Sequence, residues 1–294
     1  MTRAFRALTA EPWAIEPSWL PILAAIALRD RPTVTPEPTW AAHDMALLAG
    51  PGGRKMEGAR YAVTTADGVA LIPVFGPILP RANLMSDMSG ATTCSGLSSD
   101  YQLCLSNPEV GAVLFMIDSP GGPVSGIAAL ADQIWANRNK MPTAGHVMGS
   151  AASAAYWVGS QMPQLTADRT ALVGSIGVIA GMKKQVEPDG EGMMSFDVVS
   201  SNAPDKVPDP ETDAGMVSIL GMLDAIEAQF IADVARGRAT TATRVKSDFG
   251  QGGVLVGQAA AAAGMVDAIT SFDAAYRGLA QQVANQRKLK ALKA

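Results

Sequence analysis

The run from Val110 to Ile117 is apolar at nearly every position, and it constrains the fold more than any other part of the chain. Such a run is typical of a parallel strand that is covered on both faces. Asn107-Pro108 separates it from a helical pattern before it, and Ser119-Pro120-Gly121-Gly122 separates it from one after it. Strand and helix patterns alternate in this way from residue 61 onward. They predict an α/β domain with a largely parallel sheet and flanking helices.

The same patterns predict the order of the elements. Apolar runs predict strands over residues 69–74, 110–117, 143–148 and 196–199. Apolar residues at three- and four-residue spacing predict helices over 17–29, 97–106, 124–134 and 214–236, one starting near Ser153, and one ending at Gly264 before a strand. We divide the chain into a Pro- and Trp-containing N-terminal arm (1–60), a main domain (61–275) and a basic helical tail (276–294).

Composition and charge exclude several classes of protein. Charged residues make up 17% of the chain and the net charge is -4, so no basic surface for nucleic acid is expected. Cys94 and Cys104 are too few for a disulfide scaffold and lack metal-ligand spacing. The apolar stretch 19–28 is half the length that a bilayer requires, and it lacks the flanks of a secretion signal. We therefore expect a cytoplasmic protein that is not secreted and has no transmembrane helix or membrane anchor.

Histidine is scarce, which limits the possible chemistry. His43 lies in the Pro-rich arm, and His146 lies inside an apolar strand where a structural role is the simpler interpretation. A Ser–His–Asp triad needs an imidazole beside its nucleophile, so it is disfavoured. No cluster with metal-ligand spacing and no phosphate-binding loop of the Walker type is present in the sequence. No metal or other cofactor is expected.

Two turns rich in small residues remain as candidate sites. In the first, Gly121 and Gly122 follow Ser119-Pro120 at the carboxyl end of the buried strand, where α/β sheets bind ligands. Glycine lets the backbone approach a substrate and present an N–H group to an oxyanion, although an ordinary strand-to-helix turn would look the same. In the second, Ser153 is flanked by alanines at the start of a helix. By itself this second pattern fits a tightly packed helix equally well.

A serine nucleophile needs a base, and lysine is the next choice after histidine. Lys206 follows the predicted strand 196–199 and precedes an extended proline segment, whereas most other lysines are terminal or lie in charged segments. Considered alone, Lys206 would be read as a surface loop residue. It becomes a candidate only in combination with the two turns.

The ordered set of motifs resembles the Ser–Lys peptidase family of signal peptide peptidase A. The motifs are Ser-Pro-Gly-Gly at 119–122, Gly149-Ser150 before Ser153, Gly-Ser-Ile-Gly-Val at 174–178, Lys206, and Gly-Gln-Ala at 257–259 with Gly-Met-Val-Asp at 264–267. The arm and the segments 71–78 and 89–92 are similar to the phage capsid assembly (prohead) protease branch of that family. Two features depart from the family pattern: Ala154-Ala155 replaces Gly-Gly after the serine, and Asp205 replaces the common histidine.

The resemblance implies a role for each matching residue. Ser153 would be the nucleophile and Lys206 the general base, and the amides of Gly122 and Ala154 would form the oxyanion hole. Ser119, Pro120 and Gly121 would form the supporting turn. The family also implies a crotonase/Clp-protease-like fold and a ring-shaped homo-oligomer, in which a neighbouring protomer can complete the site and the helix over 214–236 can serve as an interface.

Several functions are compatible with these features. The first is a serine endopeptidase that processes scaffold or capsid proteins during phage head maturation, in the host cytoplasm or the prohead. A soluble bacterial peptidase of the same family is the nearest alternative. A crotonase-type acyl-CoA hydratase or isomerase would need pocket carboxylates in place of the Ser153–Lys206 pair. A catalytically silent scaffold protein on the same fold is the non-enzymatic alternative.

Overall fold

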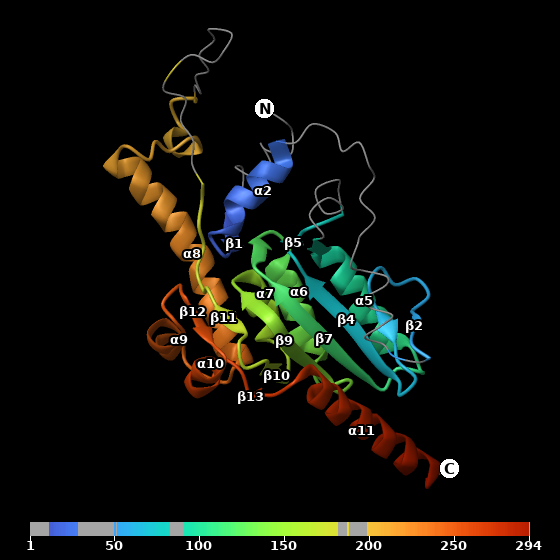
Figure 1. The fold of residues 1–294 in the computed structure, drawn as a ribbon. Helices are drawn as coiled ribbons and strands as arrows, with labels where there is room; N and C mark the ends of the chain where they lie inside the picture. The colour runs from blue at the N-terminus through green and yellow to red at the C-terminus, as the bar shows by residue number, and fades with distance from the viewer. Residues whose placement is uncertain are drawn as a thin grey trace.

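A mostly parallel sheet forms the centre of the molecule (Figure 1). The structure is a computed structural model that describes residues 12–28, 50, 52–82, 91–181, 187 and 199–293. Within this part of the chain, the strands of the sheet follow the order β12-β11-β9-β7-β4-β3-β2. The parallel centre consists of β4 (Val69–Phe75), β7 (Ala112–Ser119) and β9 (Thr143–Ala152). The predicted α/β architecture is therefore confirmed.

Shorter strands complete the sheet on both sides of this centre. Both β10 (Gln164–Ala167) and β11 (Leu172–Gly174) run parallel to β9, and β13 (Ala268–Ile269) runs parallel to β10. The outer strands β12 (Val254–Val256), β3 (Val63–Thr64) and β2 (Arg54–Lys55) are antiparallel to their neighbours. Outside this sheet, β5 (Ile78–Leu79) pairs with β6 (Thr92–Thr93).

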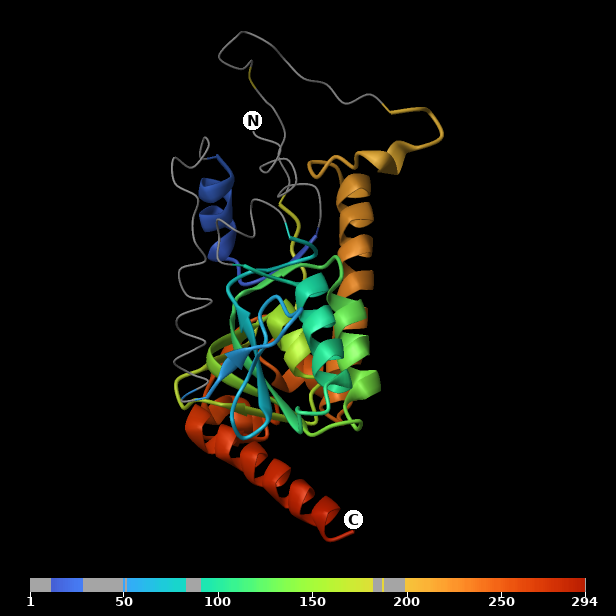
Figure 2. The same ribbon diagram turned by 90° about the vertical axis from the view of Figure 1, so that its right-hand side faces the viewer.

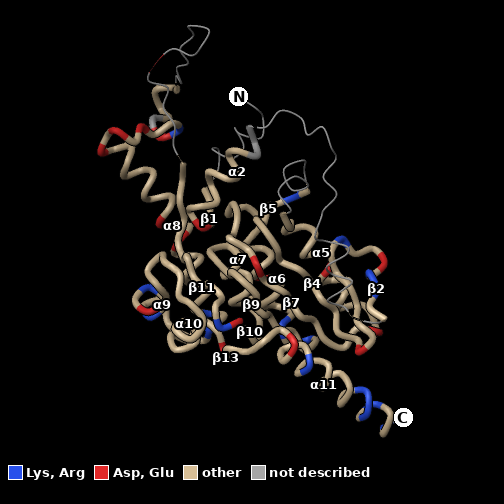
Figure 3. Tube along the Cα trace, in the orientation of Figure 1, with Lys and Arg blue, Asp and Glu red and all other residues tan. Residues whose placement is uncertain are grey.

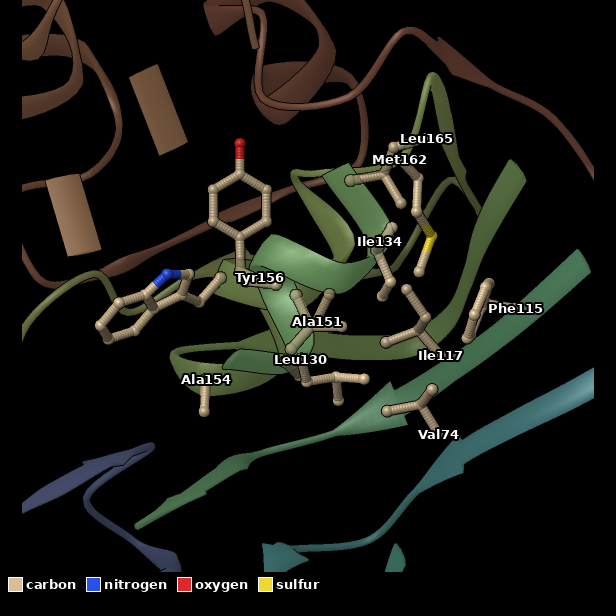
Figure 4. Close-up of a cluster of buried hydrophobic side chains, with 14 of the residues drawn as sticks. Val74, Phe115, Ile117, Leu130, Ile134, Ala151, Ala154, Tyr156, Met162 and Leu165 are labelled. Atoms are coloured by element: carbon tan, nitrogen blue, oxygen red, sulfur yellow. The ribbon is translucent and has the colours of Figure 1, made fainter. Parts of the chain in front are cut away.

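Helices cover both faces of the sheet, which explains the unbroken apolar run in β7. On one face, Val113, Phe115 and Ile117 pack in a core shared with α5 (Cys94–Ser106), α6 (Ile127–Asn137) and α7 (Ala154–Gly159). Figure 4 shows Ile117, Ile134 and Ala151 pointing into this core. On the other face, β7 packs against Leu279 and Val283 of α11 (Phe272–Ala291), and Figure 2 shows the sheet between the two helical layers. Alternate residues of one strand thus serve two different cores.

The described part of the predicted N-terminal arm is joined to the rest of the molecule. Residues Trp13–Ile15 form β1, which pairs with β8 (Gly121–Pro123), and β2 belongs to the central sheet. The predicted helix over 17–29 is observed as α2 (Trp19–Leu28). Strands from both sides of residue 60 therefore pair with one another.

The predicted helix over 214–236 is observed as α8 (Asp213–Gly237), and its two halves have different surroundings. In the C-terminal half, Phe230 stacks on Trp157 with ring centroids 4.5 Å apart, and the Trp157 indole donates a hydrogen bond to Asp233. The N-terminal half extends away from the body (Figures 1 and 2) and exposes apolar side chains. The exposed large residues are Met216, Val217, Leu220 and Met222.

Two observations describe the chemistry of this projecting half. Residues 214–223 contain no charged side chain, so the charges of α8 are Asp213 at its start and others only from Asp224 onward. Figure 3 shows this uncharged stretch in tan. Among the described helices, α8 is the one that is long and apolar enough to cross a membrane. Its C-terminal half, however, is packed in the protein. An apolar surface on a projecting helix is also typical of a protein interface.

The remaining predicted elements are largely observed. The helix before Gly264 is α10 (Gln258–Ala263), preceded by α9 (Ala242–Asp248) and followed by β13. The basic tail is helical, as the C-terminal part of α11, and its basic residues are exposed. The predicted strand over 196–199 falls mostly on residues 196–198, which lie outside the described residues.

Asp100 anchors the chain that enters β3, and its removal is expected to destabilise the fold. Its buried carboxylate accepts hydrogen bonds from the amides of Arg60, Tyr61 and Ala62 at 2.7–2.8 Å. Asp100→Ala would leave these donors unpaired, so we expect a loss of about 3 kcal/mol or more in the free energy of unfolding. Urea denaturation measures it. Asp132→Ala, which breaks only a surface ion pair with Arg236, should cost less than about 1 kcal/mol, and equal losses would contradict the assignment.

Candidate active site

The end of β9 is shaped by a bulge around the carboxylate of Asp118. Val147 pairs with Ile117 and Ala151 with Ser119, so Met148, Gly149 and Ser150 lie opposite Asp118 alone. The Ser150 amide donates a hydrogen bond of 2.9 Å to Asp118 Oδ1. Burial raises the pKa of Asp118, and the bond from Ser150 partly opposes this shift. The bulge redirects the chain just before Ser153, as bulges beside functional sites commonly do.

Ser153 has the most unusual backbone in this region. It lies between β9 and α7 with φ 54° and ψ -119°, outside the regions that residues with side chains favour. Its amide donates to the Gly174 carbonyl at 2.7 Å, and its carbonyl accepts from the Trp157 amide at 2.9 Å. The side chain is fully buried, yet Oγ has no hydrogen-bond partner among the described residues. A strained serine with an unpaired buried hydroxyl is the arrangement expected of a nucleophile at a sharp strand-to-helix turn.

The Gly121–Gly122 turn lies directly beside the turn of Ser153. Gly121 has φ 98°, and a Cβ atom placed on it would lie 3.0 Å from both the Ala152 carbonyl oxygen and the Ala154 amide nitrogen. A Cβ atom on Gly122 would overlap the carbonyl of Ile78. Both positions therefore require glycine, because the backbone of neighbouring segments fills the space. The structure thus brings together the two turns that the sequence analysis selected separately.

The amide of Gly121 is already used within its turn. It donates a hydrogen bond of 3.2 Å to the buried hydroxyl of Ser119. This contact fits the supporting role that was predicted for Ser119. The residues predicted to supply the oxyanion-hole amides, Gly122 and Ala154, belong to these two adjacent turns.

Lys206 lies in a different part of the chain. It ends the short helix η1 (Pro204–Lys206), and its side chain is exposed. The segment that contains η1 lies at the N-terminal end of α8, away from α7, in both ribbon views (Figures 1 and 2). Within one chain, the Ser153 hydroxyl makes no hydrogen bond to Lys206. The structure therefore does not join the two members of the predicted dyad inside a single protomer.

His146 has a structural environment. It is fully buried in β9, with Nδ1 2.9 Å from the Thr166 hydroxyl and Nε2 3.4 Å from an Asp168 carboxylate oxygen. Burial lowers the pKa of His146, and Asp168 opposes this shift. His146 pairs with Met116 of β7, in the regular part of the ladder before the bulge. His43 lies outside the described residues.

An open cleft of about 650 Å³ adjoins the two turns at the carboxyl ends of the parallel strands. Its lining includes Glu16, Trp19, Phe75, Asp118, Pro120 and Ser150. Among the described residues, no group of three or more His, Cys, Asp or Glu side chains could hold a metal ion.

Sequence reasoning missed the position of the segment around Ala14. The structure places Ala14 opposite Gly122, and a Cβ atom on Gly121 would overlap the Ala14 carbonyl oxygen. A weak signal was present, because Pro12 and Pro17 bracket three apolar residues and the residue before a proline favours extended backbone. That signal indicates an extended segment but does not say which strand it joins.

Comparison with known proteins supports a peptidase. The model of peptidase family S49 matches residues 135–287, about half of the chain. The chain is 34% identical over 113 residues to the head-tail preconnector protein GP5 of Enterobacteria phage P21, covering 38% of the chain and 23% of that protein. It is 32% identical over 123 residues to the capsid assembly protease C of Escherichia phage lambda, covering 38% and 26%.

A longer match extends to a bacterial enzyme. The chain is 29% identical over 227 residues to Protease 4 of Salmonella typhi, covering 74% of the chain and 35% of that protein. The chain thus spans about a quarter to a third of the length of these three relatives. It belongs to peptidase family S49. The predicted resemblance to the signal peptide peptidase A family, with its phage branch, is confirmed.

Proposed function

We propose that this chain is a serine endopeptidase in which Ser153 is the nucleophile and Lys206 the general base. The observation that carries the proposal is the buried, unpaired Ser153 hydroxyl on a strained turn, held beside the Gly121–Gly122 turn and the Ala154 amide. Strain of this kind persists only where the surrounding structure enforces it. Membership of a peptidase family adds independent support.

The mechanism is acyl transfer. Ser153 Oγ attacks the carbonyl carbon of the scissile peptide bond while its proton passes to the neutral amine of Lys206. The amides of Gly122 and Ala154 stabilise the oxyanion. The C–N bond breaks as Lys206 returns the proton to the leaving amine, which leaves an ester on Ser153. Water then hydrolyses the ester with Lys206 as base, and the serine is regenerated.

Assembly into a ring explains how an exposed lysine can serve a buried serine. General-base lysines occur in desolvated surroundings, whereas the single chain leaves Lys206 exposed. The apolar N-terminal half of α8 adjoins the η1 segment and exposes Met216, Val217, Leu220 and Met222, although Ile219 in the same half is buried. Packing of this half against a second copy would bury Lys206 near a neighbouring Ser153. We propose such a ring on a crotonase/Clp-protease-like fold, with the dyad completed between protomers.

The proposed substrates are scaffold or capsid proteins of an assembling phage head, in the host cytoplasm or the prohead. Two relatives named as a capsid assembly protease and a head-tail preconnector protein support this assignment. The match to Protease 4 supports the alternative of a bacterial peptidase with other protein substrates.

Covalent labelling tests the nucleophile directly. Prolonged treatment of the full chain with a fluorophosphonate should add one phosphonyl group, and peptide mapping should place it on Ser153. Ser153→Ala should abolish the labelling, whereas Ser150→Ala, a matched change three residues earlier, should preserve it. Labelling that persists in the Ser153 variant would refute the assignment. No labelling of any variant would favour a catalytically silent scaffold protein.

A further inference from the structure

β1 is held along both of its edges, like a peptide added between two strands. On one edge, Val124 donates a backbone hydrogen bond to the Pro12 carbonyl at 3.1 Å, and Glu16 donates one to the Pro120 carbonyl at 2.8 Å. On the other edge, Trp13 and Ile179 exchange backbone hydrogen bonds of 2.8 and 2.9 Å. Successive residues of β1 thus form hydrogen bonds to opposite neighbours. An extended peptide that binds in a groove between two strands forms hydrogen bonds in the same pattern.

The register places the Ala14 carbonyl at the candidate oxyanion hole. Bonded and non-bonded pairs alternate in an antiparallel ladder. Pro12 is hydrogen-bonded to Val124, and Glu16 is hydrogen-bonded to Pro120. The pair halfway between them, Ala14 and Gly122, is therefore also a hydrogen-bonded pair. The Gly122 amide is therefore directed at the Ala14 carbonyl oxygen. That oxygen lies against Gly121, on the side where the Ala154 amide also approaches.

The two faces of β1 are both covered. Ala14 is fully buried and packs in the main core. Trp13 and Ile15 point to the opposite face, where they form a separate apolar cluster with Leu23 of α2 and Ile179. The strand is thus fixed from inside by the core and from outside by α2. With β1 in place, the Ser153 side chain has no exposed surface.

We propose that β1 is a built-in competitor of the substrate, and this inference rests on the proposed function. It fills the peptide groove between β8 and Ile179, with the Ala14 carbonyl where the carbonyl of a substrate would react. An extended substrate peptide with a small residue opposite Gly122 must displace β1 and α2 before it reaches Ser153. The closed chain is accordingly a low-activity form, and release of this N-terminal segment opens the groove.

A reversible crosslink tests whether β1 must leave. Trp13 and Ile179 form a bonded antiparallel pair, for which the Cα separation is about 5.5 Å, within disulfide range. Burial raises the pKa of Cys94 and Cys104 to about 12, so the native thiols should not compete for oxidation. In the double variant Trp13→Cys/Ile179→Cys, the oxidised protein should react with fluorophosphonate at Ser153 at least tenfold more slowly than the reduced protein. Equal rates would overturn the proposal.

Displacement of the strand tests the same idea in the opposite direction. Ala14→Arg places a long charged side chain at a fully buried position, so it should expel β1 and accelerate labelling of Ser153 at least tenfold. Ala25→Arg makes the same chemical change at an exposed position of α2 and should label like the wild type. Circular dichroism establishes that each variant is folded. If Ala14→Arg does not fold, the crosslinked variant decides the question.

A synthetic peptide of residues 10–18 supplies a third measurement. Added to the Ala14→Arg variant, it should restore protection of Ser153, and the same peptide carrying arginine in place of Ala14 should not. If the wild type and Ala14→Arg are labelled at the same rate and the peptide gives no protection, the proposed role of β1 is wrong. The proposed function is not affected by that result. Absence of Ser153 labelling in all variants would instead refute the proposed function. Cleavage of the chain after Ala14 would also overturn the proposal, because a competitor must remain intact.

Discussion

Replacing Ser153 with alanine is expected to lower the rate of peptide-bond hydrolysis by roughly 10⁴-fold or more, because the acyl-enzyme can no longer form. The fold should survive, since the Ser153 hydroxyl has no hydrogen-bond partner among the described residues. Hydrolysis of fluorescein-labelled casein measures the rate, and thermal unfolding measures the stability. Because β1 is expected to lower the basal rate, the comparison is made in both the wild-type and the Ala14→Arg backgrounds.

Ser150→Ala is the matched control for this prediction. Ser150 lies three residues before Ser153 and uses its backbone amide, rather than its hydroxyl, to bind Asp118. Its alanine variant should retain the wild-type rate within about threefold. If Ser153→Ala and Ser150→Ala hydrolyse casein equally fast, another group is the nucleophile.

Lys206→Ala is expected to reduce hydrolysis by roughly 10³-fold or more, because no group would accept the Ser153 proton. Lys206→Arg should be equally inactive although it keeps the positive charge, since a guanidinium does not release its proton in proteins. Both variants should keep the native oligomeric mass in light scattering. A Lys206→Arg variant that remains active would show that this side chain acts through its charge and not as a base.

Complementation tests whether the lysine comes from a neighbouring protomer. Chains carrying Ser153→Ala and chains carrying Lys206→Ala are each inactive, and they are co-expressed with different affinity tags. If the dyad forms between protomers, random assembly leaves roughly a quarter of the sites with an intact serine and an intact neighbouring lysine. Activity near a quarter of the wild-type value is therefore expected. A mixed assembly as inactive as its parents would place the lysine in the same chain as its serine.

The projecting half of α8 links these experiments to the fold. A free monomer would expose Val217 and Leu220 to water, whereas a ring would cover them. The same helix reaches from this surface to Trp157 in α7, directly behind the turn of Ser153. Under the proposed function, the helix that stabilises the nucleophile turn at one end presents the assembly surface at the other.

The local sequence was sufficient to predict most of the architecture. The apolar run at 110–117 indicated a strand covered on both faces, because a strand with one solvent-facing side must alternate. Spacing of apolar residues likewise predicted α2, α5, α6 and α8, since helix periodicity is encoded by neighbours in the chain. The two turns were also recognisable from neighbouring residues alone, because Gly121-Gly122 follows a buried strand and alanines flank Ser153 at the start of a helix.

Other features arise only from contacts between distant segments. The pairing of β1 with β8 joins residues more than a hundred positions apart, and an extended three-residue segment does not specify its partner strand. The bulge at Met148–Ser150 lies opposite Asp118, whose carboxylate accepts a hydrogen bond from the Ser150 amide. The strained backbone of Ser153 is hydrogen-bonded to Gly174 and Trp157, which come from other positions in the chain. Periodicity reports which face of an element is buried, whereas register, strain and the covering of a groove depend on what is packed against it. The sequence by itself therefore determined the elements and the candidate groups, and only the tertiary structure decided that Ala14 lies opposite Gly122 and that Lys206 lies apart from Ser153 within one chain.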